Sequence, residues 1–174
     1  MARPDDTTSL AESHGGMPVR TGAGDFDFLI GEWRVRHRRL EERLTGSTEW
    51  DEFGGTTTAR KILGGNGNMD ENRIDLPNDP YLAVTLRLFD PEKGRWFIYW
   101  VDSRMPEALD PPMVGGFDDG RGVFYADDTF RGRSIRVRFL WSSSSATACR
   151  WEQAFSPDGG ESWETNWIME FTRV

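Results

Sequence analysis

The sequence predicts an all-β domain that folds as a single antiparallel barrel of about ten strands. Three observations support this prediction. Apolar and polar residues alternate with a period of two in several stretches, as in strands with one buried face. Turn-forming residues separate these stretches at the regular spacing of all-β proteins. Eight Trp, eleven Phe and three Tyr make up 13% of the 174 residues, which indicates large flat side chains packed inside the fold.

Residues 1–24 show no periodicity and are rich in Asp, Thr, Ser, Gly and Pro, which is typical of a flexible, disordered N-terminal tail. We therefore expect the barrel domain to span residues 25–174, and the chain length fits one such domain. Residues 25–30 favour one short helical turn before Gly31, and no other stretch shows a convincing helical period.

The strands are expected after Gly31, each with one apolar row of side chains facing the interior. The clearest rows are Trp33/Val35/His37, Leu82/Val84/Leu86/Leu88, Ile135/Val137/Phe139/Trp141, Cys149/Trp151/Gln153/Phe155 and Trp163/Thr165/Trp167/Met169/Phe171. Turn residues separate them at 64–67, 90–94, 118–120, 131–132, 142–145 and 156–160. The turns predict a register for each of three hairpins, and in all three the apolar faces of the paired strands coincide. The predicted pairs are Leu88 with Trp96, Trp151 with Trp167, Asp128 with Ile135 and Ala126 with Val137.

Composition excludes several classes of function. Lys and Arg total 21 against 29 Asp and Glu, a net charge of -8 with His neutral, so we expect no nucleic-acid partner. No apolar run approaches the roughly 18 residues of a membrane helix, so we expect no membrane association. The N-terminus lacks the apolar core of a secretory signal, which predicts a cytoplasmic location.

Few residues could hold a metal or a cofactor. Cys149 is the one cysteine, and His14 and His37 are the two histidines, too few for a multi-Cys or His-rich site. The carboxylates at 70–71 and 127–128 lack the spacing of a calcium loop. We therefore expect neither a metal nor a cofactor, and we interpret Cys149 as inert packing.

The face that carries the tryptophans also includes a minority of polar side chains. Such a face fills a solid core or lines a cavity, and the sequence leaves both alternatives open. Polar groups on a buried apolar wall are typical of a ligand pocket. The candidate ligand-binding residues are Trp33, His37, Arg39, Trp100, Asp102, Phe139, Trp151, Gln153, Thr165 and Trp167.

Two of these residues are also candidate catalytic groups. His37 lies among arginines that lower its pKa if they are close. A neutral imidazole there can act as a base or bind a haem iron, and the alternative is a histidine that is hydrogen-bonded within the wall. Asp102 ends an aromatic strand, where it either pairs with Arg104 or Arg39 or accepts a proton.

Residues 156–163, SPDGGESW, resemble an Asp-box, the hairpin motif of sialidases and other β-proteins. The resemblance implies a rigid hairpin held by the Asp158 side chain and the packed Trp163. Only one copy is present, so neither a propeller nor sialidase activity is implied.

Gly31-Glu32-Trp33 resembles the G-x-W of lipocalins and the wider calycin barrels, in which the Trp closes one barrel end and an Arg near the last strand packs over it. Arg173 matches that Arg. The longer pattern at 25–33, 99–104, 151–156 and 164–169 resembles an uncharacterised bacterial calycin-like family with a domain of unknown function, over residues 25–174. Related nitrobindin-type barrels bind haem through a histidine near the C-terminus, but no histidine follows position 37 here.

We therefore expect a calycin, or lipocalin-like, barrel that binds a small, largely apolar or aromatic molecule in a Trp-lined cavity. The alternative is a cofactor-free isomerase, cyclase or hydrolase-like enzyme that uses His37 or Asp102 as acid or base in the same cavity. A third alternative is a solid barrel whose outer face binds a partner, such as a second copy in a homodimer.

Overall fold

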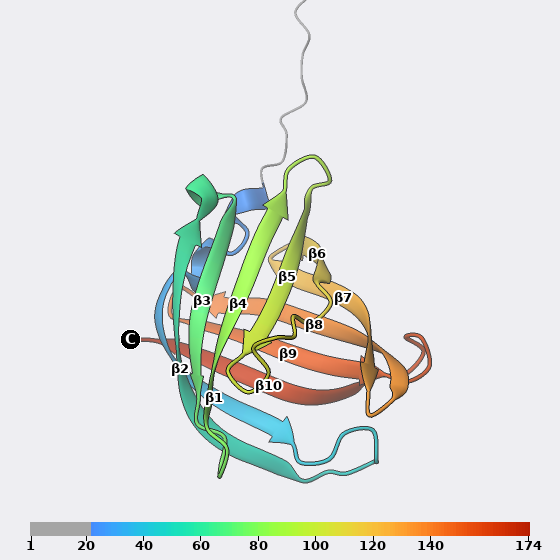
Figure 1. The fold of residues 1–174 in the computed structure, drawn as a ribbon. Coiled ribbons are helices and arrows are strands. Elements are labelled where there is room, and N and C mark those ends of the chain that lie inside the picture. The colour runs from blue at the N-terminus through green and yellow to red at the C-terminus, as the bar shows by residue number, and fades with distance from the viewer. Residues whose placement is uncertain (1–21) are drawn as a thin grey trace, which may run out of the picture.

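The computed structural model describes residues 22–174, which form a closed barrel of ten antiparallel strands (Figure 1). Each strand pairs with its neighbours in sequence, and β1 closes the barrel against β10. The strands are β1 Gly31–Leu40, β2 Trp50–Ile62, β3 Gly67–Ile74, β4 Tyr81–Asp90, β5 Arg95–Asp102, β6 Met113–Asp118, β7 Arg121–Phe130, β8 Arg133–Ser145, β9 Ala148–Ser156 and β10 Glu164–Arg173. This confirms the predicted fold class.

Short 3-10 helices precede the barrel at Gly22–Gly24 and Asp27–Leu29, and a third, Leu63–Gly65, joins β2 to β3. The second helix is the turn expected over residues 25–30. Most of the expected tail, residues 1–21, lies outside the described residues. Gly22–Gly24 belong to the folded domain, because the Trp96 indole donates a hydrogen bond of 3.2 Å to the Gly22 carbonyl oxygen.

The N-terminal segment closes one end of the barrel as the G-x-W resemblance implies. The Trp33 indole donates to the Leu29 carbonyl at 2.7 Å, and the Arg173 guanidinium lies 4.2 Å from the centre of the Trp33 ring. Arg173 also donates to the carbonyls of Ile30 and Phe28 at 2.8 Å each. Gly31 has a φ of +127°, and a Cβ there would lie 2.5 Å from Arg173 Nη1, so a larger residue at this position is strained.

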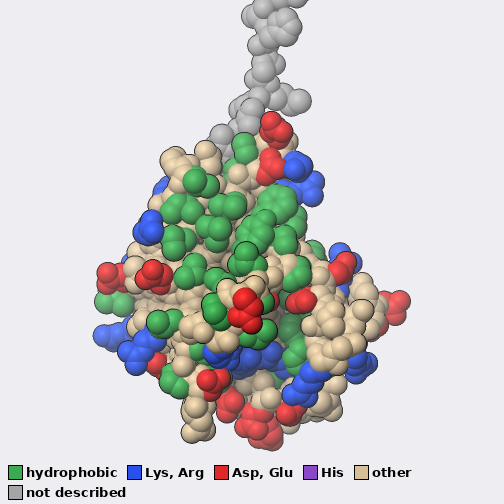
Figure 2. Space-filling model, in the orientation of Figure 1, with side chains coloured by type: hydrophobic (Ala, Val, Ile, Leu, Met, Phe, Trp, Pro, Cys, Tyr) green, Lys and Arg blue, Asp and Glu red, His purple; other side chains and the backbone are tan. Residues whose placement is uncertain are grey.

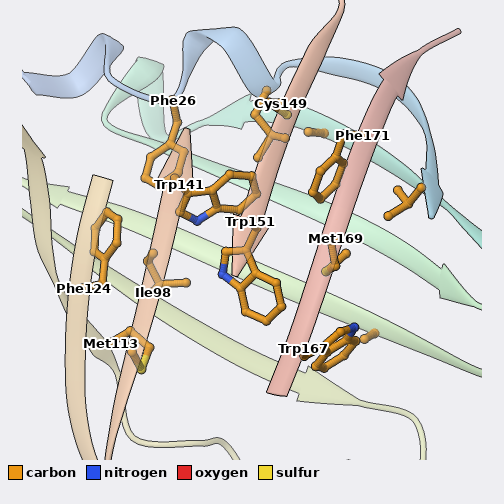
Figure 3. Packing of buried hydrophobic residues seen from close by; sticks show 14 of the residues in the cluster. Phe26, Ile98, Met113, Phe124, Trp141, Cys149, Trp151, Trp167, Met169 and Phe171 are labelled. Atoms are coloured by element: carbon orange, nitrogen blue, oxygen red, sulfur yellow. The ribbon is translucent and has the colours of Figure 1, made fainter. Parts of the chain in front are cut away.

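Aromatic side chains fill the closed half of the barrel (Figure 3). Phe26 lies at its centre, with its ring 5.0 Å from that of Trp96 and 5.8 Å from that of Trp141, both edge to face. Such contacts add to the stabilisation from burial. The inward rows of β1, β8, β9 and β10 therefore lie where the alternation predicts, except for Trp163 and Thr165 in the last row.

The three predicted registers have different outcomes. The β7–β8 register is confirmed, with Asp128 opposite Ile135 and Ala126 opposite Val137. In β9–β10 Glu164 rather than Trp163 lies opposite Phe155, and the bulge between Thr165 and Trp167 adds a second position of shift. Trp151 therefore lies opposite Met169 rather than Trp167. Trp167 still faces inward, because a shift of two positions preserves the face of a strand.

The β4–β5 register was wrong by one residue. Asp90 pairs with Arg95 and Phe89 with Trp96, so Leu88 lies opposite Phe97. A register slip of one residue exchanges the inward and outward faces of a strand. The leucine row of β4 therefore faces outward, with Leu82 61% exposed. The inward row of β4 is instead Tyr81/Ala83/Thr85/Arg87/Phe89, because Arg87 pairs with a buried carboxylate on β3.

The prediction that Trp163 faces inward was also wrong, because Trp163 packs on the outside of the barrel. Its ring lies 4.4 Å from the Arg138 guanidinium and 5.9 Å from the Tyr125 ring. The cause is the Asp-box hairpin, which turns Trp163 back over the outer surface. Asp158 Oδ1 accepts hydrogen bonds from Ser156 Oγ at 2.7 Å and from the Ser162 amide at 2.9 Å, as the resemblance implies.

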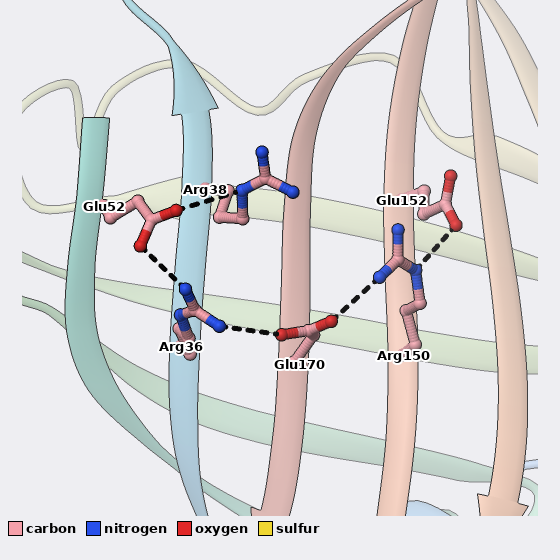
Figure 4. A network of polar contacts seen from close by, with 6 residues as sticks. All are labelled: Arg36, Arg38, Glu52, Arg150, Glu152 and Glu170. Carbon is pink, nitrogen blue, oxygen red and sulfur yellow. Dashed lines mark hydrogen bonds and ion pairs between the residues drawn. The ribbon is translucent and has the colours of Figure 1, made fainter. Parts of the chain in front are cut away.

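The outer surface differs between the two sides of the barrel. Across β2, β1, β10 and β9 it carries exposed ion pairs, shown in Figure 4, that link Arg36, Arg38, Glu52, Arg150, Glu152 and Glu170. Exposed pairs of this kind contribute little stability each. The leucine row of β4 lies on the other side, where Figure 2 shows hydrophobic side chains gathered.

Two features are absent from residues 22–174. No helix in this part of the chain has both the length and the apolar character needed to cross a membrane. No three His, Cys, Asp or Glu side chains among the described residues gather closely enough to hold a metal ion.

Candidate ligand-binding cavity

The barrel encloses a cavity of about 230 Å³ beyond the aromatic plug of the closed end. Inward side chains from every strand except β2 line it, together with residues of the loops that follow β1 and β5. The tryptophan-bearing face therefore encloses space rather than a solid core. Closure of ten strands produces this geometry, because a barrel of that size is wider than its inward side chains fill.

Aromatic rings make the apolar wall of the cavity (Figure 3). The rings of Phe139 and Trp151 lie 4.8 Å apart, those of Trp151 and Trp167 5.4 Å apart, and those of Trp167 and Trp100 6.1 Å apart. All three pairs meet edge to face, an arrangement that fixes each ring against its neighbour. The wall is therefore a preformed aromatic surface.

A buried polar network joins β2, β3 and β4, and its β3 and β4 residues line part of the cavity. Asp70 and Arg87 form an ion pair of 2.6 Å, and their side chains are 2% and 3% exposed. Asn72 Nδ2 donates to Asp70 Oδ1 at 2.5 Å, and Thr57 Oγ1 donates to Asn72 Oδ1 at 2.6 Å. The hydrogen bonds offset the cost of removing these two charges from water.

The cavity has an entrance region, which we define as Arg39, Arg43, Tyr81 and Arg104. Arg39, Arg43 and Arg104 line both the inner cavity and a neighbouring hollow on the surface, so they lie between inside and outside. The Arg39 guanidinium lies 4.9 Å from the Trp167 ring. Burial lowers the pKa of Arg39, and burial followed by the Arg39 charge lowers that of Arg43 to about 10. Arginine side chains stay protonated in proteins, so both are cations at neutral pH.

Asp102 lines the cavity but is committed to an ion pair. Its Oδ2 lies 2.7 Å from Arg104 Nη2, and its Oδ1 accepts from the Arg104 amide at 3.0 Å. The hydrogen bonds from Arg104 hold the pKa of Asp102 below its usual value. The pairing with Arg104 that the sequence allowed is therefore confirmed, and an ionised, paired carboxylate is a weak proton acceptor.

His37 lies behind the cavity wall rather than on it. Its ring is 1% exposed and stacks on Phe53 at 4.8 Å, and its Nδ1 accepts a hydrogen bond of 3.2 Å from the Trp167 indole. Burial, followed by the Arg39 charge, lowers the pKa of His37 from 6.5 to about 4, so the imidazole is neutral at pH 7. His37 thus orients Trp167, which does line the cavity.

The structure brings together most of the candidate ligand-binding residues. Those that line the cavity are Arg39, Trp100, Asp102, Phe139, Trp151, Gln153 and Trp167. Trp33 lies in the closed end, His37 behind Trp167, and Thr165 beside the β10 bulge, and none of the three lines the cavity. Gln153 donates to Asn166 Oδ1 at 2.9 Å, which ties the cavity wall to the bulge.

Sequence reasoning missed the polar network and part of the entrance region. The sequence did contain a sign of the network, because Asn68, Asp70 and Asn72 alternate along one stretch and so share one face of a strand. The structure shows that all three side chains are buried. Arg43 had none, because it follows β1 in a loop where no periodicity exists.

Comparison with known proteins identifies a barrel of the same architecture. No family model matches the sequence, and a search of curated proteins finds no match. Among solved structures, an S-type phycobiliprotein lyase from Guillardia theta is similar, with a TM-score of 0.57 and 11% identity. The match covers 90% of this chain and 94% of the lyase. The chain therefore shares its barrel fold with this lyase.

Proposed function

We propose that this protein binds a small, largely apolar or aromatic molecule in the barrel cavity. The observation that carries the proposal is a cavity of about 230 Å³ with a wall of aromatic rings and with polar and charged side chains beside that wall. Apolar walls with a few placed polar groups are typical of ligand pockets, whose volumes for drug-sized ligands begin at roughly 300 Å³. The ligand is therefore smaller than drug-sized, on the scale of one or two fused rings.

The fold likeness supports a ligand-binding barrel and nothing narrower. At 11% identity the shared property is architecture, and we do not extend lyase activity to this chain. The placement of the two candidate catalytic groups also favours binding over catalysis. His37 does not line the cavity, and Asp102 is paired with Arg104.

Isothermal titration calorimetry with 2-naphthol, which is uncharged at pH 7, tests this proposal. Ala126 lines the cavity on β7, so Ala126→Trp fills the space that the ligand occupies. The matched control is Ala146→Trp, which adds the same side chain at an exposed position in the turn between β8 and β9. Near-ultraviolet circular dichroism of each variant reports whether the barrel still packs.

We expect the native protein and the Ala146→Trp variant to bind 2-naphthol, and a folded Ala126→Trp variant to bind at least about tenfold more weakly, the loss expected when ~1.4 kcal/mol of contact is removed. The proposal fails if the native protein gives no binding heat. It also fails if the folded Ala126→Trp variant binds as well as the control.

A further inference from the structure

Two arginines of the entrance region lack a direct carboxylate partner among the described residues. Within residues 22–174, neither Arg39 nor Arg43 forms an ion pair, whereas Arg104 pairs with Asp102 at 2.7 Å and Asp79 at 3.3 Å. Partly buried charges without a partner are costly. Two of them beside one apolar cavity indicate a place for an anion.

Arg39 is directed to the cavity by its place on β1. It continues the inward row of Trp33, Val35 and His37, and its guanidinium stacks on Trp167. Asp51 lies opposite Arg39 in the strand register but forms no ion pair with it. The Arg39 guanidinium therefore packs against Trp167 in the aromatic wall and lines the cavity.

Arg43 is held in place by the loop after β1. Glu164 accepts the amide hydrogen of the adjacent Leu44, at 2.8 Å to one carboxylate oxygen and 3.0 Å to the other. The Arg43 guanidinium lies 5.8 Å from the Phe155 ring and 5.9 Å from the Phe130 ring. This loop contact and the two rings fix a cation beside the cavity without neutralising it by direct ion pairing.

Tyr81 adds a neutral donor between these charges. It lines the cavity, and the Arg104 guanidinium lies 3.5 Å from its ring centre. Burial raises the pKa of Tyr81, so its hydroxyl keeps its proton at neutral pH. Two guanidinium groups and a phenol hydroxyl are donors that match the oxygens of a carboxylate.

Two of the acidic residues that line the cavity, Asp70 and Asp102, are already ion-paired with arginines. Asp128 lies on β7 and forms no ion pair with Arg43, although the Arg43 guanidinium lies 5.9 Å from the ring of Phe130 on the same strand. Burial, followed by the charges of Asp128 and Asp102, raises the pKa of Asp110. Within the described part of the chain, Arg39 and Arg43 are therefore left without a direct carboxylate partner at the entrance.

We propose that the ligand is an aromatic or apolar carboxylate, whose ring body lies against the tryptophan wall and whose carboxylate is bound by Arg39 and Arg43, with Tyr81 as a third donor. This inference rests on the proposed function and adds the charge and the orientation of the ligand. The body enters first, because the apolar wall lies inside and the cations lie at the entrance.

Three naphthalene probes of one shape and different charge test the inference by calorimetry: 2-naphthoate, 2-naphthamide and 2-naphthylmethylammonium. The variant is Arg39→Gln/Arg43→Gln. The matched control is Arg34→Gln/Arg60→Gln, which changes the net charge equally. It removes two exposed arginines, on β1 and β2, that form no ion pair with any residue of 22–174.

We expect the native protein and the control to prefer 2-naphthoate over 2-naphthamide by about tenfold or more, the scale of one or two charged hydrogen bonds. In the Arg39→Gln/Arg43→Gln variant this ratio falls to near one, while 2-naphthamide still binds. Equal binding of the two probes by the native protein, tighter binding of the ammonium probe, or an unchanged ratio in the variant overturns the inference and leaves the proposed function standing. If none of the probes binds, and 2-naphthol does not bind either, both proposals are wrong.

Discussion

Replacing His37 with asparagine removes a buried group whose titration destabilises the folded protein in acid. The folded state holds the imidazole neutral, with a pKa of about 4 against 6.5 for an exposed histidine. Below pH 6.5 the unfolded chain binds a proton that the folded protein does not bind. Stability contributed by the neutral ring is therefore complete above about pH 6.5 and is lost as the pH falls toward 4.

The size of this loss follows from the two pKa values. At ~1.4 kcal/mol for each pH unit, the interval from 6.5 to about 4 corresponds to roughly 3 kcal/mol. The asparagine side chain of the His37→Asn variant presents an amide oxygen near the position of the imidazole Nδ1, so it can still accept the hydrogen bond from Trp167. His14 is present in both proteins, so its titration cancels when the two are compared.

Urea unfolding followed by tryptophan fluorescence, from about pH 7.5 down to about pH 4.5, measures this effect. The free energy of unfolding of the native protein is expected to fall more steeply than that of His37→Asn, by about 1.4 kcal/mol per pH unit at most. Any constant cost of the substitution shifts one curve without changing its slope. Parallel curves over this range would refute the view that His37 is held neutral behind Trp167.

Two further substitutions test the packing that surrounds the cavity. Asp70→Asn leaves Arg87 buried without its carboxylate partner and should lower the free energy of unfolding, measured in urea, by about 3–5 kcal/mol. Asp70→Leu/Arg87→Met should lower it less, because it removes both charges. Equal losses in the two variants would contradict the role given to the ion pair. Gly31→Ala should destabilise the protein by about 1–3 kcal/mol, because φ is positive at this residue and the new Cβ approaches Arg173. The control is Gly46→Ala, where φ is +79° but no atom lies within 4 Å of the new Cβ, so this variant should lose less stability. A larger loss in Gly46→Ala would contradict the close approach at Gly31.

Alternation predicted most of the barrel correctly, but it could not decide the direction of β4. Both faces of that strand carry apolar residues, with Leu82 and Leu88 on one and Tyr81 and Phe89 on the other. The deciding interaction is the ion pair of Arg87 with Asp70, which are 17 positions apart and on different strands. Local pattern carries no information about such a pair, so the more polar row was assigned to the outside.

The candidate site was predictable where residues lie on regular strands. Trp100, Trp151 and Trp167 follow from period-two alternation in a closed barrel. The unpaired charge of Arg43 depends on loop conformation and on the contact between Leu44 and Glu164, which are 120 positions apart. The position of His37 behind the wall likewise depends on the size of Trp167, which intervenes between the imidazole and the cavity.

A crystal structure of the complex with 6-bromo-2-naphthoate, recorded at the bromine absorption edge, would locate the ligand and its orientation in one experiment. We expect an anomalous peak inside the barrel beside Trp141 and Trp151, with the carboxylate at Arg39 and Arg43. A bromine peak confined to the outer surface, or side chains that fill the interior and leave no room for the ring, would contradict it.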